Sequence, residues 1–205
     1  VELMLGRELV NMFPAHGDVT SDQPLLEVRD LWPDGTLEPF NFAVHPGEIL
    51  GLAGQLGSGS GDALAVIGGA KSSRGGEILY EGDVFLPTSP TEAIARGIAY
   101  CSDDRKVDGL FLGRPILENM TSPALKSFSR FGIIDQKKER EQALSNGEKF
   151  TVDVSRMDAE AGVLSGGNQQ KVALGKWLAI NPKVLLVNEP TRGVDVGARA
   201  EIYQK

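Results

Sequence analysis

Apolar side chains fall into short runs along this sequence, and each run is bounded by glycine, proline or charged residues. Leu25–Leu31 and Phe40–Val44 alternate between apolar and polar positions, which is typical of strands with one covered face. The turn signal Pro33-Asp34-Gly35 lies between them. These residues therefore predict an antiparallel β edge layer over residues 25–50.

Two further runs are apolar throughout, as expected of strands buried on both faces. Ile49–Ala53 precedes a glycine-rich loop and the apolar helix Ala63–Ile67, and Val184–Val187 ends in polar residues. This order predicts an α/β fold with a mainly parallel core sheet and a helical subdomain over about residues 110–165. The other predicted elements are strands at Ile78–Tyr80 and Ile98–Cys101, helices at Thr91–Arg96, Gln136–Lys149 and Ser165–Ile180, and an irregular stretch over residues 103–132.

Composition narrows the class of protein. With 205 residues, 41% hydrophobic and 24% charged, the chain can bury one large core. Its 21 basic and 28 acidic residues give a net charge of −7 without a basic stripe, so we expect no nucleic-acid partner.

The longest charge-free stretch, Ile49–Gly61, is 13 residues. A membrane span needs about 20 apolar residues, so none is expected. The lone Cys101 excludes an intramolecular disulfide.

The two ends of the sequence indicate that this chain is a fragment of a longer protein. Val1 is not an initiator methionine, and the helical pattern of Gly197–Lys205 stops without a cap. Residues 1–24, rich in proline, glycine and aspartate near their end, are interpreted as the tail of a preceding domain and a linker. One domain is then expected over residues 25–205, truncated at its C-terminus.

The glycine-rich loop has half of a phosphate-binding pattern. Gly54 and Gly59 have the spacing of the P-loop G-x-x-x-x-G-K-[ST], whose backbone N–H groups surround a phosphate. Ser60 replaces the lysine, and Gly61 replaces the residue whose hydroxyl binds Mg²⁺. A flexible turn without chemistry is an equally weighted alternative. The candidate residues are Gly54, Gln55, Leu56, Gly57, Ser58, Gly59, Ser60, Gly61 and Asp62.

A second candidate cradle opens the helix that begins near residue 165. Ser165 can cap this helix, and two glycines after it leave the first N–H groups uncovered for an anion. A plain helix cap is the simpler alternative. The strand Val184–Val187 then places Asn188 and Glu189 at the edge of the sheet where ligands bind in α/β folds. We predict that the Gly54–Gly61 loop lies at the end of this strand.

Taken together, these runs resemble the nucleotide-binding domain of ABC transporters, a P-loop NTPase fold. They are most similar to the second of the two such domains in the ATPase subunit of bacterial simple-sugar importers (ribose, xylose and galactose type). The similar segments are the signature (Leu164, Ser165, Gly166, Gly167, Asn168, Gln169), Walker B (Val184–Glu189), the D-loop run Thr191–Gly197 with Gly193, Val194 and Asp195, the Q-loop region Gly97–Leu110, and Met4–Leu9.

The resemblance implies roles for single residues and for ATP and Mg²⁺. Glu189 would be the general base, and Asn188 stands where an aspartate supports Mg²⁺. Asp103 stands at the position of the Q-loop glutamine. Trp32 lies where an adenine-stacking aromatic can fall, although we favour a core or turn role. Because Ser60, Gly61 and Asn188 all depart from the family pattern, the domain's own P-loop site is expected to be degenerate.

The resemblance also implies partners. Two such domains meet head to tail, so this signature would complete the ATP site of the first domain in the same polypeptide. The transmembrane permease and, indirectly, a periplasmic sugar-binding protein would be the other partners, at the cytoplasmic face of the inner membrane. A structural pseudo-ATPase that couples to the permease without hydrolysis is the alternative. A DNA-repair ABC ATPase is rejected, because Gly54 to Ser165 is too short for that class's insertions and the charge is acidic.

Overall fold

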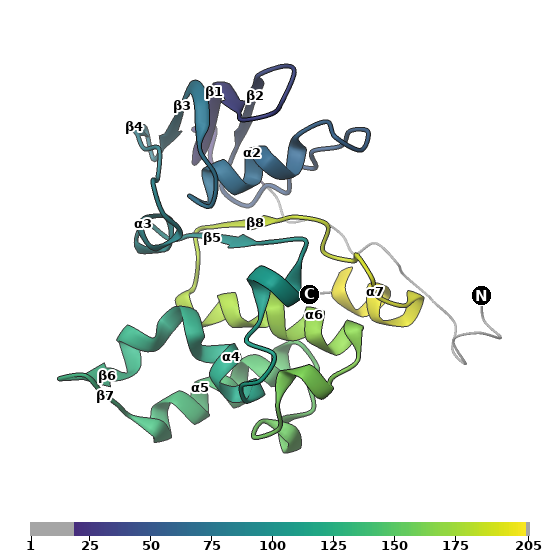
Figure 1. The fold of residues 1–205 in the computed structure, drawn as a ribbon. Helices are drawn as coiled ribbons and strands as arrows, with labels where there is room; N and C mark the ends of the chain where they lie inside the picture. The colour runs from purple at the N-terminus through teal and green to yellow at the C-terminus, as the bar shows by residue number, and fades with distance from the viewer. Residues whose placement is uncertain (1–18, 204–205) are drawn as a thin grey trace. The chain divides into compact units, whose positions relative to one another are not determined.

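The computed structural model describes residues 19–203, and Figure 1 draws them as a ribbon. They divide into two units. The sheet unit contains residues 19–100 and 184–188, and the helical unit contains residues 101–183 and 189–203. Most of the expected tail over residues 1–24, with the run Met4–Leu9, lies outside the described residues.

The sheet unit contains a four-stranded sheet with the order β2-β1-β3-β4. Every pairing in it is antiparallel, and Leu26 lies opposite both Val44 and Tyr80. The antiparallel layer expected over residues 25–50 is therefore confirmed for its two strands. The strands are β1 (Leu26–Pro33), β2 (Phe40–Val44), β3 (Ser73–Tyr80) and β4 (Asp83–Val84).

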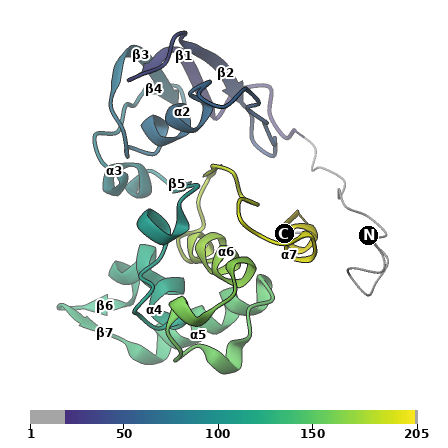
Figure 2. The same cartoon turned by 45° about the vertical axis from the view of Figure 1, so that its right-hand side comes forward.

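Helix α2 (Ser60–Ile67) lies against this sheet in both ribbon views (Figures 1 and 2). Its Val66 and Ile67 share one hydrophobic core with Leu26 and Ile78 of the sheet, all of them buried. Each such side chain stabilises the unit by about 1.5–3 kcal/mol relative to exposure. The alternation seen in the sequence supplies this covered face.

A second, two-stranded sheet pairs β5 (Ile98–Cys101) with β8 (Val184–Val187). The Val184 N–H donates to the Gly97 carbonyl oxygen at 3.1 Å, so the two strands start side by side and run in the same direction. Ile98, Val184 and Leu186 join the hydrophobic core of the sheet unit. Helix α3 (Pro90–Ala95) precedes β5.

The predicted strand Ile49–Ala53 is wrong for this structure. The segment has no strand conformation, and Ile49 and Leu50 are 75% and 39% exposed. An apolar run becomes a strand only where a neighbouring strand accepts and donates its backbone hydrogen bonds. The three sheets of the described residues do not include this segment.

The helical unit packs short helices around buried methionine and alanine side chains. Met120, Ala143 and Met157 are fully buried, and the buried Thr121 hydroxyl donates to the Glu139 carboxylate at 2.9 Å. The elements are a π-helical turn (Arg105–Gly109), α4 (Ile116–Thr121), a 3₁₀ segment (Ser122–Phe128), the hairpin β6 (Ser129–Arg130) and β7 (Ile133–Ile134), α5 (Gln136–Lys149), two 3₁₀ turns (Val154–Arg156 and Ala161–Val163), α6 (Gly166–Gly175) with its 3₁₀ continuation (Lys176–Ile180), and α7 (Val196–Tyr203).

The irregular stretch expected over residues 103–132 is a second correction, because it contains the π-helical turn, α4 and a 3₁₀ segment. Each is too short to show a helical period in a window of about 11–18 residues.

The sequence does not explain why a glycine stands at position 175 inside helix α6, but the structure does, because neighbouring side chains occupy the space of a side chain there. A Cβ at Gly175 would lie 3.0 Å from Met120 Cε and 3.2 Å from Phe150 Cδ2.

Candidate functional site

The glycine-rich loop of the sheet unit turns tightly before α2. Gly57 and Gly59 have φ of 86° and 84°, a region that favours glycine. A Cβ at Gly59 would lie 2.2 Å from Thr36 Cγ2, and one at Gly54 would lie 2.4 Å from Ser58 Oγ. Gly59 stands at the N-cap of α2 without a side-chain hydrogen bond to the first turn. The loop therefore turns tightly into the N-terminus of α2, and its role as a phosphate cradle stays a prediction.

The end of this loop meets the end of β8, as predicted. A Cβ at Gly61 would lie 2.7 Å from Asn188 Nδ2 and 3.1 Å from Asn188 Oδ1. The amide of Asn188 thus fills the space that a side chain at position 61 would need. Asp62, the next residue and part of the first turn of α2, forms an ion pair with Lys71 (Oδ1–Nζ 2.5 Å).

These residues do not fit a Mg²⁺ ion at this loop. Mg²⁺ prefers hydroxyl, carboxylate and water oxygens at short distances, and here a glycine faces a neutral amide. In residues 19–203 no group of three or more His, Cys, Asp or Glu residues is placed to hold a metal. Ser60 also supplies no positive charge for a phosphate, and its Oγ accepts a hydrogen bond from Ser58 Oγ at 3.4 Å.

The signature residues open α6 in the helical unit, and the predicted N-cap is confirmed. The Asn168 N–H donates to the Oγ of the exposed Ser165 at 3.4 Å. Leu164 and Gln169 are buried, and Gln169 Nε2 donates to the Ala161 carbonyl oxygen at 3.4 Å. Ser165 therefore presents the positive end of the helix to the outside, while its neighbours anchor the turn.

The two signature glycines also have a packing role. A Cβ at Gly166 would lie 2.9 Å from the Gly193 carbonyl oxygen, and one at Gly167 would lie 2.6 Å from Ala198 Cβ. The absence of side chains therefore lets the D-loop run and α7 approach the start of α6. Sequence reasoning considered these glycines only as a phosphate cradle.

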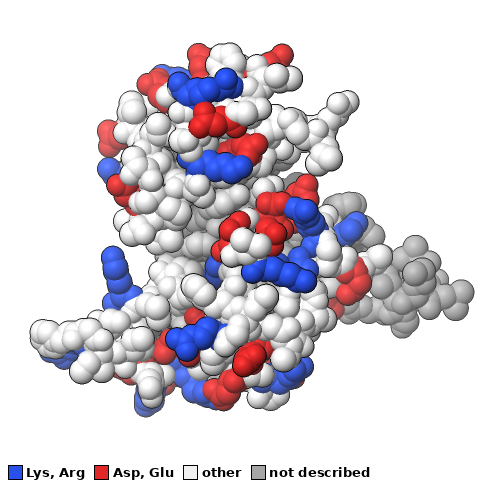
Figure 3. Space-filling view, in the orientation of Figure 1, with Lys and Arg blue, Asp and Glu red and all other residues white. Residues whose placement is uncertain are grey.

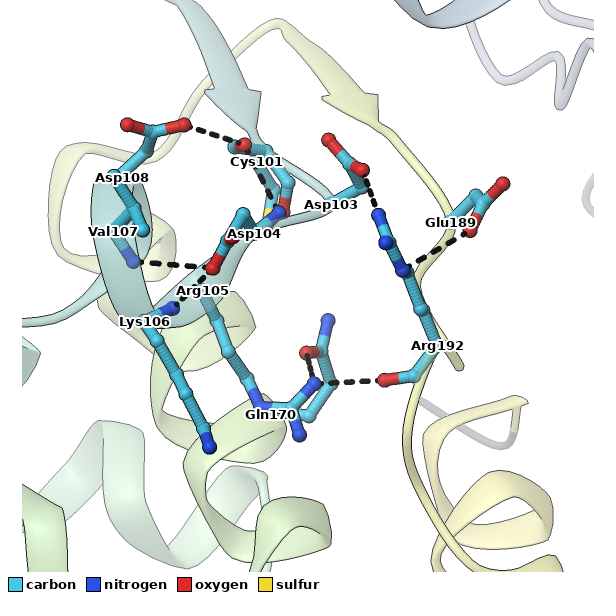
Figure 4. Close-up of polar contacts among 11 residues, drawn as sticks. Cys101, Asp103, Asp104, Arg105, Lys106, Val107, Asp108, Gln170, Glu189 and Arg192 are labelled. Carbon is cyan, nitrogen blue, oxygen red and sulfur yellow. Dashed lines mark hydrogen bonds and ion pairs between the residues drawn. The ribbon is translucent and has the colours of Figure 1, made fainter.

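Two acidic candidates of the helical unit, Asp103 and Glu189, meet at an arginine that sequence reasoning did not single out. Arg192 Nη1 pairs with Asp103 Oδ2, and Arg192 Nε lies 3.9 Å from Glu189 Oε2 (Figure 4). The Glu189 side chain is 59% exposed, and its backbone has a φ of 44°, which is uncommon for a residue with a side chain. The signal in the sequence was the position of Arg192 inside the D-loop run.

The remaining candidates have local contacts of their own. Asp195 accepts from the Ala198 N–H at 2.9 Å and so caps α7, two residues after Gly193 with its φ of 64°. Trp32 Nε1 donates to the Thr36 carbonyl oxygen at 3.0 Å, and the Arg74 guanidinium lies 5.1 Å from the ring centre. The contacts of Trp32 with Thr36 and Arg74 suit a turn role for this side chain, which is 38% exposed. Val194 is half-buried.

Charge does not by itself mark a binding surface. Over the face drawn in Figure 3, Lys and Arg lie interspersed with Asp and Glu. Among the residues that the structure describes, no helix combines the length and apolar character of a membrane span. The candidate site is therefore defined by the local geometry of the glycine-rich loop and of the start of α6.

Comparison with known proteins decides the family. The family model described as "ABC transporter" matches residues 37–192. The chain belongs to the ABC transporter family. This ABC domain is 42% identical over 204 residues to the ribose import ATP-binding protein of Geobacillus kaustophilus (strain HTA426). It is 38% identical over 204 residues to a ribose import ATP-binding protein of Escherichia coli O157:H7.

The ABC domain is matched over its whole length, but it spans only about two fifths of these relatives (41% and 40%). A solved ATP-binding cassette of an ABC transporter superposes with a TM-score of 0.72 at 25% identity, over 89% of this chain and 75% of that one. A dimeric cassette bound to ADP and phosphate has the same fold at 23% identity, with a TM-score of 0.72 over 87% and 80% of the two chains. The expected P-loop NTPase fold is thus confirmed.

Proposed function

We propose that this chain is the ATP-binding module of a sugar importer, and that it acts through its signature helix on the ATP of a partner domain. Its own P-loop site is degenerate and does not hydrolyse ATP. The contrast between the two cradles carries this proposal. At the loop, Asn188 fills the space beside Gly61, whereas at α6 the capped helix start with Ser165 is exposed.

The chemistry of the helix start supports a role at a phosphate. The first turn of a helix offers N–H groups and the positive end of the helix dipole, which favour an anion. Ser165 adds a hydroxyl at the same point. A terminal phosphate supplied by the partner domain would be held there, while the partner's own P-loop would hold the rest of the nucleotide and its metal ion.

The names of the relatives support the substrate class and the partners. Proteins that share about two fifths of their length with this chain are called ribose import ATP-binding proteins. We therefore infer that the partner is the first nucleotide-binding domain of the same polypeptide. The complex would include a transmembrane permease and, indirectly, a periplasmic sugar-binding protein, at the cytoplasmic face of the inner membrane.

The test uses two variants at Ser165 in the full-length protein with its permease. Asp and Asn are both good N-cap residues, so Ser165→Asp and Ser165→Asn should keep the helix start equally well. Only the aspartate brings a negative charge to the phosphate, and two charges about 4 Å apart repel by about 4 kcal/mol near a protein surface. We expect Ser165→Asp to lower ATP turnover about tenfold or more, and Ser165→Asn to lower it much less.

Equal turnover of the two variants would contradict the proposed contact with phosphate. A full-length protein that transports sugar normally with Ser165→Asp would instead favour the non-hydrolytic structural module. Thermal unfolding of both variants serves as the control for intact folding.

A further inference from the structure

One buried arginine of the helical unit is not used by the function proposed above. Arg105 is 9% exposed and begins the π-helical turn Arg105–Gly109 (Figure 4). Asp104 holds this turn, because its Oδ1 accepts from the N–H groups of Lys106 and Val107 at 3.1 Å each. The turn is thereby fixed in a shape that directs the Arg105 side chain inward.

The Arg105 guanidinium binds two consecutive carbonyl groups of the D-loop run. Its Nη1 donates to the Arg192 carbonyl oxygen at 2.7 Å, and its Nη2 donates to the Gly193 carbonyl oxygen at 3.2 Å. Nη1 also donates to Gln170 Oε1 in α6 at 3.4 Å. A planar fork of donors suits such a pair of acceptors, and a lysine ammonium cannot reproduce it.

The start of α6 closes on the same guanidinium. A Cβ at Gly166 would lie 2.9 Å from Arg105 Nη2 and 2.9 Å from the Gly193 carbonyl oxygen. Three segments that are far apart in the sequence therefore meet at one side chain. The side chain of Arg192 holds this turn from its other end, through its contacts with Asp103 and Glu189.

We propose that Arg105 is a positioning residue, which fixes the Arg192–Gly193 turn against the first turn of α6. It thereby sets how Glu189 and Ser165 are presented to the nucleotide between the two domains. The inference rests on the proposed function for its effect on turnover, but the coupling of the three segments does not depend on that function.

The test compares Arg105→Lys and Gly166→Ala with the unchanged full-length protein and its permease. Arg114→Lys is the matched control, because the Arg114 side chain is 68% exposed and forms a surface ion pair with Glu118 of α4 (Nε–Oε2 3.2 Å). Amide hydrogen exchange of residues 165–169 and 189–195 reports the coupling directly. The KM for ATP and the kcat are measured in parallel.

We expect both variants to raise exchange in these two segments by about tenfold while the rest of the helical unit exchanges as before. We also expect the kcat of Arg105→Lys to fall about tenfold with KM for ATP changed less than about twofold, since the Arg105 guanidinium is buried and donates to carbonyl groups of the chain itself. Arg114→Lys should change neither.

Unchanged amide exchange at residues 165–169 and 189–195 would overturn the proposal. A uniform rise in exchange, or a loss of folding, across the helical unit would also overturn it, because Arg105 would then only stabilise the unit as a whole. The outcome for the proposed function is separate. If local exchange rises while kcat stays the same, the positioning role stands and the role of the signature in hydrolysis fails.

Discussion

At the scale of single residues, Gly61 and Asn188 pack against each other at the end of the glycine-rich loop. The amide of Asn188 occupies the space that a side chain at position 61 would need. Restoring the family pattern at position 61 alone therefore meets a steric obstacle before it can change any chemistry. The two departures from the family pattern are physically linked.

A double-mutant cycle tests this link. Gly61→Ala should gain less than the about 1 kcal/mol that a helical Gly→Ala change ordinarily gains, because its Cβ would lie 2.7 Å from Asn188 Nδ2 and the amide would have to move. Asn188→Ala removes the obstacle, so the double variant should be more stable than the sum of the two effects by about 0.5–3 kcal/mol. Urea unfolding measures all four proteins, and simple additivity would contradict the packing link.

The thiol of Cys101 permits a second test at this scale. Burial raises the pKa of Cys101 to about 11, with Lys176 and Trp177 close enough to oppose the rise. Because this pKa is higher than in the unfolded chain, its contribution to stability is full below about pH 9 and is lost as the pH rises to about 11.

At pH 8 only about one Cys101 thiol in a thousand is ionised, and the thiolate is the reactive form. We expect a maleimide or disulfide reagent to leave the native protein almost unlabelled and to label it fully in denaturant. Rapid labelling of the native protein would contradict the buried environment.

At the scale of elements, α6 carries both the candidate phosphate contact and the packing of α7. Lys171, whose side chain is 9% exposed, pairs with Glu201 of α7 at 2.5 Å, and Gly167 lets Ala198 approach. A substitution at Gly167 therefore acts on the arrangement of two helices as well as on any phosphate. This is why Ser165 offers the cleaner test of function.

Gly167→Ala tests the packing without adding charge. A helical Gly→Ala change ordinarily stabilises by about 1 kcal/mol, but here the Cβ would lie 2.6 Å from Ala198 Cβ. We expect a loss of about 1–3 kcal/mol instead, measured by thermal unfolding. Asn168→Ala on the same helix is the control, and a gain in stability for Gly167→Ala would contradict the close contact.

At the scale of the whole molecule, the chain contains one half of each of two nucleotide sites in the proposed arrangement. Its P-loop lacks the lysine and the hydroxyl, and Asn188 stands in place of the acidic residue of Walker B, while its signature is complete. Each lost charged contact costs on the order of 1.5–3 kcal/mol. The activity of the module should therefore depend on its partner domain.

We expect the isolated chain to show negligible ATP hydrolysis, measured as phosphate release with Mg²⁺ present. Glu189→Gln should leave this low rate unchanged, because a general base has no well-held phosphate to act on. Substantial turnover by the isolated chain that Glu189→Gln abolishes would contradict the degenerate site.

The sequence by itself determined those features that are written in local patterns. The β1–β2 hairpin follows from two alternating runs around a turn, and the Ser165 cap follows from a serine before two glycines. The position of the loop at the end of β8 also follows from strand order, since ligand loops and strand ends share one edge of an α/β sheet.

Tertiary structure decided what depends on neighbours distant in the sequence. Ile49–Ala53 has the composition of a buried strand but lacks a pairing partner, and α4 is too short to show a period. In the sequence, Gly61 and Gly166 indicate only a loop and a cradle. In the structure, Asn188 lies where a side chain at position 61 would be, and Arg105 lies where a side chain at position 166 would be. Composition and spacing describe what a segment can form, whereas the space around a Cβ and the partners of a buried guanidinium exist only after the chain has folded.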